Sequence, residues 1–245
     1  MTADQFDISL EHYFAEVGSF SLAVFYKKFN DYIQYGGFNQ DVTVNGVTRT
    51  VLTRGPVNGD GAKIRGAEAA YQRYFDFLPA PFDGLGIQAN FTYIENKGVT
   101  NANLSNASGG GSSNTSGGGL TQADGAVKVN TLEGLSKYSY NLVGMYEKGR
   151  WAVRAAYNWR SKYLLTAMDC CLLFPVWQDD AGYLDASVRF RASDNLEISL
   201  QGSNLLNTES VLKQQVTDSD KGGLLKDNAW SRTDRRYLLT FRYKY

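Results

Sequence analysis

The chain has 245 residues, and its 25 lysines and arginines balance its 25 aspartates and glutamates, so the formal net charge is zero. This balance argues against nucleic acid or an anionic membrane surface as the main partner. No stretch approaches the ~18 consecutive apolar residues that a membrane-spanning helix needs. The first residues also lack the basic start and apolar centre of a signal peptide. With 16 tyrosines, 13 phenylalanines and 25 glycines, the sequence is rich in aromatics and turn formers, yet its mean hydropathy is only −0.35.

Apolar and polar residues alternate from end to end with a period of two, which predicts β-strands. In chain order, the predicted strands lie near 5–14, 19–34, 62–76, 84–96, 134–147, 151–160, 184–191, 196–201 and 237–245. The last strand is the clearest, because Tyr237, Leu239, Phe241, Tyr243 and Tyr245 share one face. About nine strands result, each long enough to cross a bilayer at a tilt, which takes ~9–11 residues.

Alternation alone does not decide whether the apolar face of these strands meets lipid or a protein core, because a soluble sandwich and a membrane barrel show the same pattern. Two other features favour lipid. Aromatic residues such as Trp151 and Trp159 lie near strand ends, which is typical of interfacial girdles. Tight turns at 15–18, 147–150 and 192–195 and a short connection at 77–83 alternate with long loops near 35–60, 97–133, 166–180 and 207–231. Short turns on one rim and long loops on the other favour an all-β fold, a transmembrane antiparallel β-barrel.

The strand directions predict that the sequence is the C-terminal portion of a larger barrel. If the short turns are periplasmic, the last strand ends in the periplasm at Tyr245, and the first strand begins on the extracellular rim at Met1. Nine strands is an odd count, whereas single-chain bacterial barrels have even counts. An absent upstream part explains both anomalies and the missing signal peptide. The predicted location is the outer membrane of a Gram-negative bacterium.

Several stretches resemble the C-terminal barrel of TonB-dependent receptors. Segments 61–68, 134–142 and 157–164 resemble internal strands, 202–207 (GSNLLN) resembles the ending of the penultimate strand, and 235–245 resembles the closing strand with its terminal aromatic. The likeness covers most of the chain apart from its loops, and the last two stretches most resemble the oligosaccharide-scavenging subgroup. The resemblance implies a barrel of about 22 strands, with a signal peptide, a plug domain and a TonB-binding segment that lie outside this sequence.

The resemblance also implies a function, which is TonB-energised uptake of a scarce nutrient, an oligosaccharide or a siderophore. The implied partners are outer-membrane lipid, the TonB complex (through the absent N-terminal part), the barrel-assembly machinery and a small-molecule or oligosaccharide ligand. The closing residues Tyr237, Leu239, Phe241, Tyr243 and Tyr245 resemble the assembly signal of such barrels. A simple interfacial anchor at Tyr245 is an equal alternative. The alternative function is a passive porin, or a small barrel acting as channel or adhesin. An outer-membrane enzyme is the third hypothesis and a soluble β-sandwich binder the fourth.

No residue pattern predicts catalysis, a metal site or a cofactor. The single histidine, His12, falls on the apolar face with Leu10 and Phe14, which indicates an interfacial residue. The adjacent Cys170 and Cys171 fit no metal-ligand spacing. Two interpretations of this pair remain: cysteines of a loop without a defined role, or a redox or ligand-clamping pair.

Candidate ligand contacts lie in the long loops, at Trp177, Asp179, Asp180 and Trp230. An aromatic face beside carboxylates suits a sugar, although both tryptophans are alternatively residues of the extracellular girdle. The two aspartates lack the ligand spacing of a calcium loop and are interpreted as solvated. Charged residues of the polar strand faces are predicted to face the lumen, and to pair with one another or with the absent plug, because unpaired charges there are costly. They are Arg154, Arg160, Asp185, Arg189 and Glu197.

Overall fold

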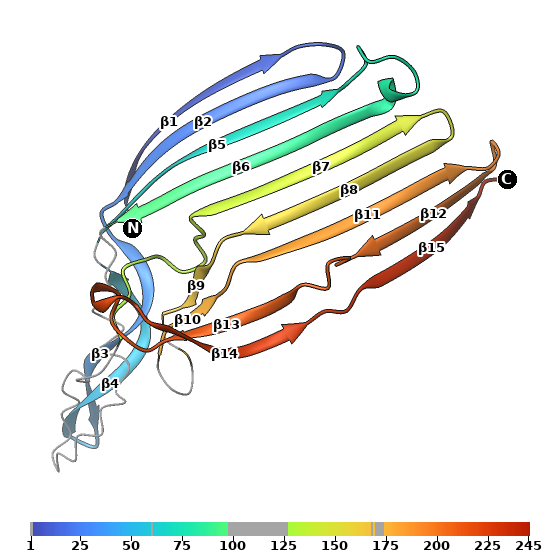
Figure 1. The fold of residues 1–245 in the computed structure, drawn as a ribbon. Coiled ribbons are helices and arrows are strands. Elements are labelled where there is room, and N and C mark those ends of the chain that lie inside the picture. The colour runs from blue at the N-terminus through green and yellow to red at the C-terminus, as the bar shows by residue number, and fades with distance from the viewer. Residues whose placement is uncertain (1, 60, 98–126, 168, 170–173) are drawn as a thin grey trace.

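The computed structural model describes residues 2–59, 61–97, 127–167, 169 and 174–245 (Figure 1). These ranges contain fifteen β-strands and two short 3-10 helices, η1 (Phe82–Gly84) and η2 (Ser219–Lys221). Neither helix of the described chain has the length and apolar character needed to cross a membrane. The prediction of an all-β fold is confirmed.

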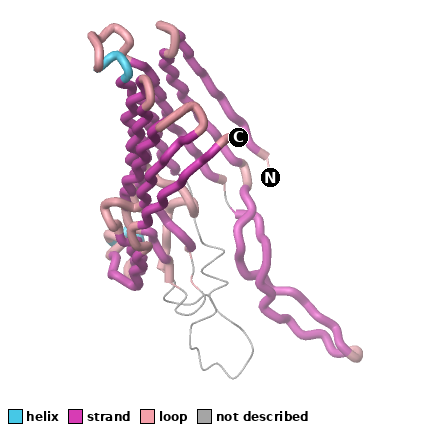
Figure 2. Tube along the Cα trace, turned by 90° about the vertical axis from the view of Figure 1, so that its right-hand side faces the viewer, coloured by secondary structure: helices cyan, strands magenta, loops and turns pink. Residues whose placement is uncertain are grey.

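Nine strands form one antiparallel sheet in which each strand is hydrogen-bonded to the next. In order across the sheet they are β1 (Ala3–Tyr13), β2 (Gly18–Phe29), β5 (Ala62–Tyr74), β6 (Leu85–Lys97), β7 (Tyr138–Lys148), β8 (Trp151–Arg160), β11 (Ala181–Arg191), β12 (Leu196–Ser203) and β15 (Arg236–Tyr243). β1 and β15 are the two edges, so this part of the chain forms a curved wall rather than a closed barrel (Figures 1 and 2). These nine strands correspond to the nine that the alternation predicts.

Two predicted strands are too long: β2 ends at Phe29 rather than at residue 34, and β7 begins at Tyr138 rather than at Gly134. Gly134 has a φ of 75°, a left-handed conformation that interrupts an extended chain. Its N–H donates to the carbonyl of Leu164 instead of to a neighbouring strand of the wall. The segment before β7 is therefore bound to the chain that follows β8.

The register sorts the alternating residues onto two opposite faces. Leu10 pairs with Leu22 and Leu200 pairs with Leu239, while Ser139 pairs with Arg160. Residues directly opposite each other in an antiparallel pair point to the same side, so one face is apolar and the other polar. Leu10 is 59% exposed and Leu200 is 50% exposed. A broad exposed apolar face of this kind is the surface that a membrane barrel presents to lipid.

Aromatic residues lie at both ends of the apolar face. One end carries Phe20, Tyr71, Tyr146, Trp151, Phe190 and Tyr243, and the other carries Tyr26, Tyr93, Tyr138, Trp159 and Tyr237. Along β8, the step from Trp151 to Trp159 covers about 27 Å, which at a strand tilt of about 35–45° spans roughly 20 Å, most of an apolar band ~25 Å tall. His12 pairs with Phe20 and stacks on Phe14 at 5.7 Å between ring centroids, so it lies on the apolar face as predicted.

The connections divide between two rims. The links β1–β2, β5–β6, β7–β8 and β11–β12 are short and lie at the end of the wall that also carries the C-terminus (Figure 1). We call this end the short-turn rim. The links β2–β5, β6–β7, β8–β11 and β12–β15 are long and lie at the opposite end, the long-connection rim. This is the alternation that the sequence predicts.

Three of the four segments predicted as long loops contain further strands, which corrects their description as loops. The 35–60 segment holds most of β3 (Tyr32–Val44) and β4 (Val47–Gly59), which form a two-stranded hairpin that projects beyond the wall (Figure 2). Its turn is Asn45-Gly46, with φ values of 53° and 77°, the backbone that a tight hairpin turn requires. Most of the fourth loop, 97–133, and the cysteines at 170 and 171 lie outside the described residues.

The other two segments contribute to a four-stranded sheet at the long-connection rim. Its order is β14 (Leu225–Arg232), β13 (Glu209–Gln215), β10 (Val176–Gln178) and β9 (Tyr163–Thr166). We call it the rim sheet. Its packed centre is a small cluster of Val129, Leu164 and Ala167, with Trp177 against it. A small core of this kind suffices to order the chain above one part of the wall.

Candidate functional site

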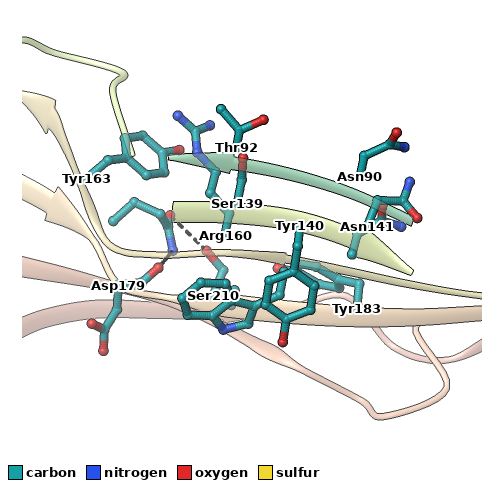
Figure 3. A pocket seen from close by; sticks show the side chains of 14 residues that line it. Asn90, Thr92, Ser139, Tyr140, Asn141, Arg160, Tyr163, Asp179, Tyr183 and Ser210 are labelled. Carbon is teal, nitrogen blue, oxygen red and sulfur yellow. Dashed lines mark hydrogen bonds between the residues drawn. The ribbon is translucent and has the colours of Figure 1, made fainter. Parts of the chain in front are cut away.

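A pocket of about 500 Å³ lies on the polar face, where the wall meets the rim sheet (Figure 3). The wall contributes Asn90, Thr92, Ser139, Asn141, Asn158, Arg160, Ala181 and Tyr183 from its polar face, with Tyr140 and Trp159 of the apolar face at the border, and the residues beyond β8 and in the rim sheet contribute Tyr163, Gln178, Asp179 and Ser210. Most of these side chains end in an amide or a hydroxyl group. The polar groups at the pocket are therefore mostly uncharged, and aromatic rings supply apolar surface beside them.

Two rows of residues across the sheet form the pocket floor. In one row, Asn90 of β6 pairs with Asn141 of β7, which pairs with Asn158 of β8. The third asparagine pairs with Tyr183 of β11, so the strand register brings three amides and a phenol into a line. The Oδ1 atom of Asn141 is buried and has no hydrogen-bond partner within the described chain. Buried amide oxygens usually have a partner, so this amide at the pocket floor has an unused acceptor.

The second row contains Arg160, whose guanidinium is held on one side of the pocket. Its Nε donates to the hydroxyl of Ser136 and one terminal nitrogen donates to the carbonyl of Gly134. The guanidinium carbon also lies 3.8 Å from the ring centroid of Tyr163, which is a close cation–π arrangement (Figure 3). Arg160 was expected to pair with another charge or with a plug, but its partners here are neutral.

Asp179 is the second charged residue at the pocket, and it has a cationic partner. Its carboxylate lies 2.6 Å from Nζ of Lys213. The hydrogen bond to this carboxylate, followed by the attraction of its charge, raises the pKa of Lys213. In Figure 3 the Asp179 carboxylate points away from Asn90 and Thr92. Asp179 therefore fixes β13 against the start of β11 and presents little charge to the pocket.

Gln178 is held firmly at the outer side of the pocket. Its Nε2 donates to the carbonyl of Val211 at 3.2 Å, and its Oε1 accepts a hydrogen bond from the hydroxyl of Ser210 at 3.1 Å. These bonds join β10 to β13. The amide of Gln178 is thereby oriented before any ligand enters.

The remaining candidate ligand contacts lie away from the pocket. Trp177 belongs to β10 rather than to a loop, and it packs against the buried cluster of the rim sheet. Trp230 lies on β14 and is 69% exposed. Asp180 is exposed and does not line the pocket. Of the four residues proposed from the sequence, the structure brings only Asp179 to this site.

The other charged residues of the polar face lie closer to the short-turn rim. Arg154, Arg189 and Glu197 line a second hollow of about 380 Å³. Within it, Arg189 lies 3.9 Å from Glu197 and 3.8 Å from Glu147. Asp185 instead accepts a hydrogen bond from the backbone N–H of Asn204 at 2.8 Å, and so fixes the chain after β12. No group of three or more metal-ligating side chains gathers anywhere in the described ranges.

The closing strand carries its aromatic residues on the exposed apolar face. Tyr237, Phe241 and Tyr243 are each more than 60% exposed, and the ring of Tyr243 meets that of Tyr245 edge to face at 5.5 Å. Within the described ranges, β15 pairs with β12 on one side and with no strand on the other. The residues that resemble an assembly signal are thus accessible in the wall described here.

The wall has a polar face, an exposed apolar band between two aromatic belts, short connections at one rim and long connections at the other. These features define the wall of a membrane β-barrel. The chain belongs to the TonB dependent receptor-like, beta-barrel family, whose family model matches residues 1–205. This confirms the resemblance to TonB-dependent receptors, while the likeness to the oligosaccharide-scavenging subgroup stays a prediction. Barrels of this family lie in the outer membrane of Gram-negative bacteria and are transporters rather than enzymes. No functionally curated protein sequence matches the chain.

Solved structures of similar fold include the siderophore receptor PiuA from Acinetobacter baumannii, with 17% identity and a TM-score of 0.56 over 99% of this chain. The copper transporter OprC (12%, 0.54) and the ferric citrate transporter FecA in its unliganded form (13%, 0.55) each match 98% of this chain. At these identities the likeness concerns the fold alone. The match covers 28%, 30% and 31% of those three chains, so this chain spans under a third of their length.

Proposed function

We propose that this chain forms part of the wall and outer binding surface of a receptor for TonB-energised uptake of a neutral, polyhydroxylated nutrient such as an oligosaccharide. The observation that carries the proposal is the lining of the pocket, where Asn90, Asn141 and Asn158 stand in a row. Amides and hydroxyls both donate and accept hydrogen bonds, as sugar hydroxyls do. The rings of Tyr163 and Tyr183 supply apolar surface beside them.

A siderophore is the second substrate class, and the pocket lining suits it less well. A ferric complex of carboxylates or catecholates presents oxyanions, which bind best to cations that have no other partner. Among the described residues, Arg160 is the one cation that lines this pocket, and two of its N–H donors already bind Ser136 and Gly134. The lining therefore favours the sugar.

The remaining partners follow from family membership. The TonB complex would act through a plug and a TonB-binding segment outside this sequence, and the short-turn rim with the C-terminus would face the periplasm. The barrel-assembly machinery would read the closing residues from Tyr237 to Tyr245. Arg154, Arg189 and Glu197 would face the lumen and contact the plug.

Calorimetric titration of the detergent-purified receptor that carries this chain tests the substrate class. The probes are a panel of neutral gluco-, xylo- and manno-oligosaccharides, and ferric citrate. We expect a sugar to bind, and Asn158→Leu to weaken it about tenfold, because each lost hydrogen bond contributes ~0.5–1.5 kcal/mol. Gln72→Leu, on the polar face outside the pocket, is the matched control. Binding of ferric citrate without any sugar would reassign the pocket to metal chelates.

The energy source is tested separately, by uptake of the radiolabelled ligand into cells. A protonophore should abolish uptake, because TonB depends on the proton-motive force. Uptake that persists with the protonophore, together with steady conductance in a planar bilayer, would identify a passive porin instead.

A further inference from the structure

An arginine lies on the apolar face, at the end nearest the short-turn rim. Arg73 pairs with Gly18 of β2 and with Ile87 of β6. It lies two residues after Tyr71 along β5, so the two side chains share a face. These neighbours place it on the same side as the exposed apolar residues rather than on the polar face. A charged side chain on the lipid-facing side costs least near the interface, and the strand end places Arg73 at the level of the lipid headgroups.

The side chains around Arg73 provide aromatic rings. Its guanidinium carbon lies 4.7 Å from the ring centroid of Phe77 and 5.6 Å from that of Phe14. Both distances lie within the range of a cation–π interaction. Phe77 lies in the connection between β5 and β6 and is 63% exposed. The group of Arg73, Phe14 and Phe77 is therefore open on the side of Phe77.

The guanidinium has no oxygen partner in the described part of the chain. Its Nε is buried and makes no hydrogen bond, and Arg73 takes part in no ion pair there. Asp83 of η1, in the connection that follows β5, is bound to Lys148. The hydrogen bond from Lys148 is the main cause that lowers the pKa of Asp83. Arg73 therefore combines a stacked cation with unused donors.

We propose that Arg73, Phe14 and Phe77 form a binding site for the phosphate of a membrane phospholipid in the leaflet at the short-turn rim. A guanidinium presents paired donors that match two phosphate oxygens, and it stacks on aromatic faces at the same time. A long arginine side chain at the end of a membrane strand extends toward the headgroups in this way. Val17 and Phe82, exposed in the adjoining turns at 47% and 55%, extend the apolar surface to the acyl chains. The site depends on the membrane location of the wall and not on the nutrient.

Native mass spectrometry of the detergent-purified receptor carrying this chain tests the site. The protein is incubated with dioleoyl phosphatidylglycerol or with dioleoylglycerol, which has the same acyl chains and no phosphate. We expect one more bound phosphatidylglycerol than dioleoylglycerol, and at least a tenfold loss of this adduct in Arg73→Gln, because the charge-assisted hydrogen bonds to the phosphate are lost. Arg65→Gln is the matched control, because Arg65 lies on the same strand at the opposite rim and is bound to Glu95.

Folding of each variant is checked by its heat-dependent migration on a gel. If Arg73→Gln does not fold, Phe77→Ala keeps the cation and removes one ring, and it is expected to lower phosphatidylglycerol occupancy. Equal binding of the two lipids by the unaltered protein, or equal phosphatidylglycerol binding by Arg73→Gln, would overturn the proposal. Displacement of the lipid by inorganic phosphate would also overturn it and indicate a site for free phosphate.

Discussion

The indole Nε1 of Trp177 donates a hydrogen bond to Oε1 of Gln215 at 2.8 Å, which joins β10 to β13. Gln215 is 1% exposed, and its Nε2 lies 3.1 Å from the carbonyl oxygen of Lys128 and 2.8 Å from that of Thr217. One side chain thus connects three segments that are distant in sequence. The rim sheet, and with it the outer side of the pocket, depends on this amide.

Replacing Gln215 by Leu should loosen the rim sheet without unfolding the wall. The substitution leaves the indole N–H and two carbonyls without their partner, and each buried unsatisfied group costs ~1–3 kcal/mol. We expect red-shifted tryptophan emission and earlier proteolysis between β8 and β14. Gln214→Leu is the control, because the Gln214 side chain makes one longer bond, 3.3 Å, to Asp169. Equal effects of the two substitutions would contradict the role given to Gln215.

The buried cluster predicts a contrast between two adjacent leucines of β9. Leu164 is 0% exposed, whereas Leu165 is 43% exposed. Leu164→Ala should destabilise the rim sheet by about 2–5 kcal/mol because it leaves a cavity, while Leu165→Ala should cost well under half of that. Hydrogen exchange at the amides of β10 and β13 measures the difference. Similar protection in both variants would show that the cluster does not stabilise the sheet.

The rim sheet should also weaken in acid. The pKa of Asp218 lies below its ordinary value, first because the backbone N–H of Lys128 donates to it at 2.9 Å, and then because Lys221 lies 3.0 Å away. A carboxyl group whose pKa is lowered in the folded state stabilises that state above the ordinary value of about 3.9. The contribution is lost as the pH falls through the lowered folded pKa.

We therefore expect tryptophan emission of the unaltered protein to shift as the pH falls below about 4, where the aspartate takes up a proton. Asp218→Asn should reduce this step, because an amide oxygen still accepts the Lys128 N–H and does not titrate. Identical acid transitions in the two proteins would assign the step to other carboxyl groups.

The wall could be predicted from the sequence because alternation with period two survives in each of its strands. Leu196, Ile198 and Leu200 alternate with polar residues in β12, and a strand that is apolar on one face and polar on the other has few alternatives. The rim strands were missed for the opposite reason. β10 is only three residues long, and its pairing depends on β9 and β13, which are distant along the chain.

The pocket was missed because its floor exists only across strands. Asn90, Asn141 and Asn158 are ordinary polar residues of three separate strands, and the register alone makes them neighbours. A prediction of the strand pairing would have found this row. The sequence instead drew attention to Trp177, which packs inside the rim sheet, because a tryptophan in an expected loop suggests a ligand contact.

The assignment of the apolar face to lipid makes a prediction for two adjacent residues of β12. Leu200 pairs with Val188 and Leu239 in the middle of the apolar face, whereas Ser199 pairs with Arg189 and Thr240 on the polar face. An arginine on the lipid face near the bilayer midplane costs about 2–4 kcal/mol, and a substitution on the lumen face is tolerated better. Leu200→Arg should therefore lower the free energy of unfolding in lipid vesicles far more than Ser199→Arg. Urea titration of the vesicle-inserted receptor, followed by tryptophan fluorescence, measures both values. If Ser199→Arg were the more destabilising change, the polar face rather than the apolar face would have to meet the lipid.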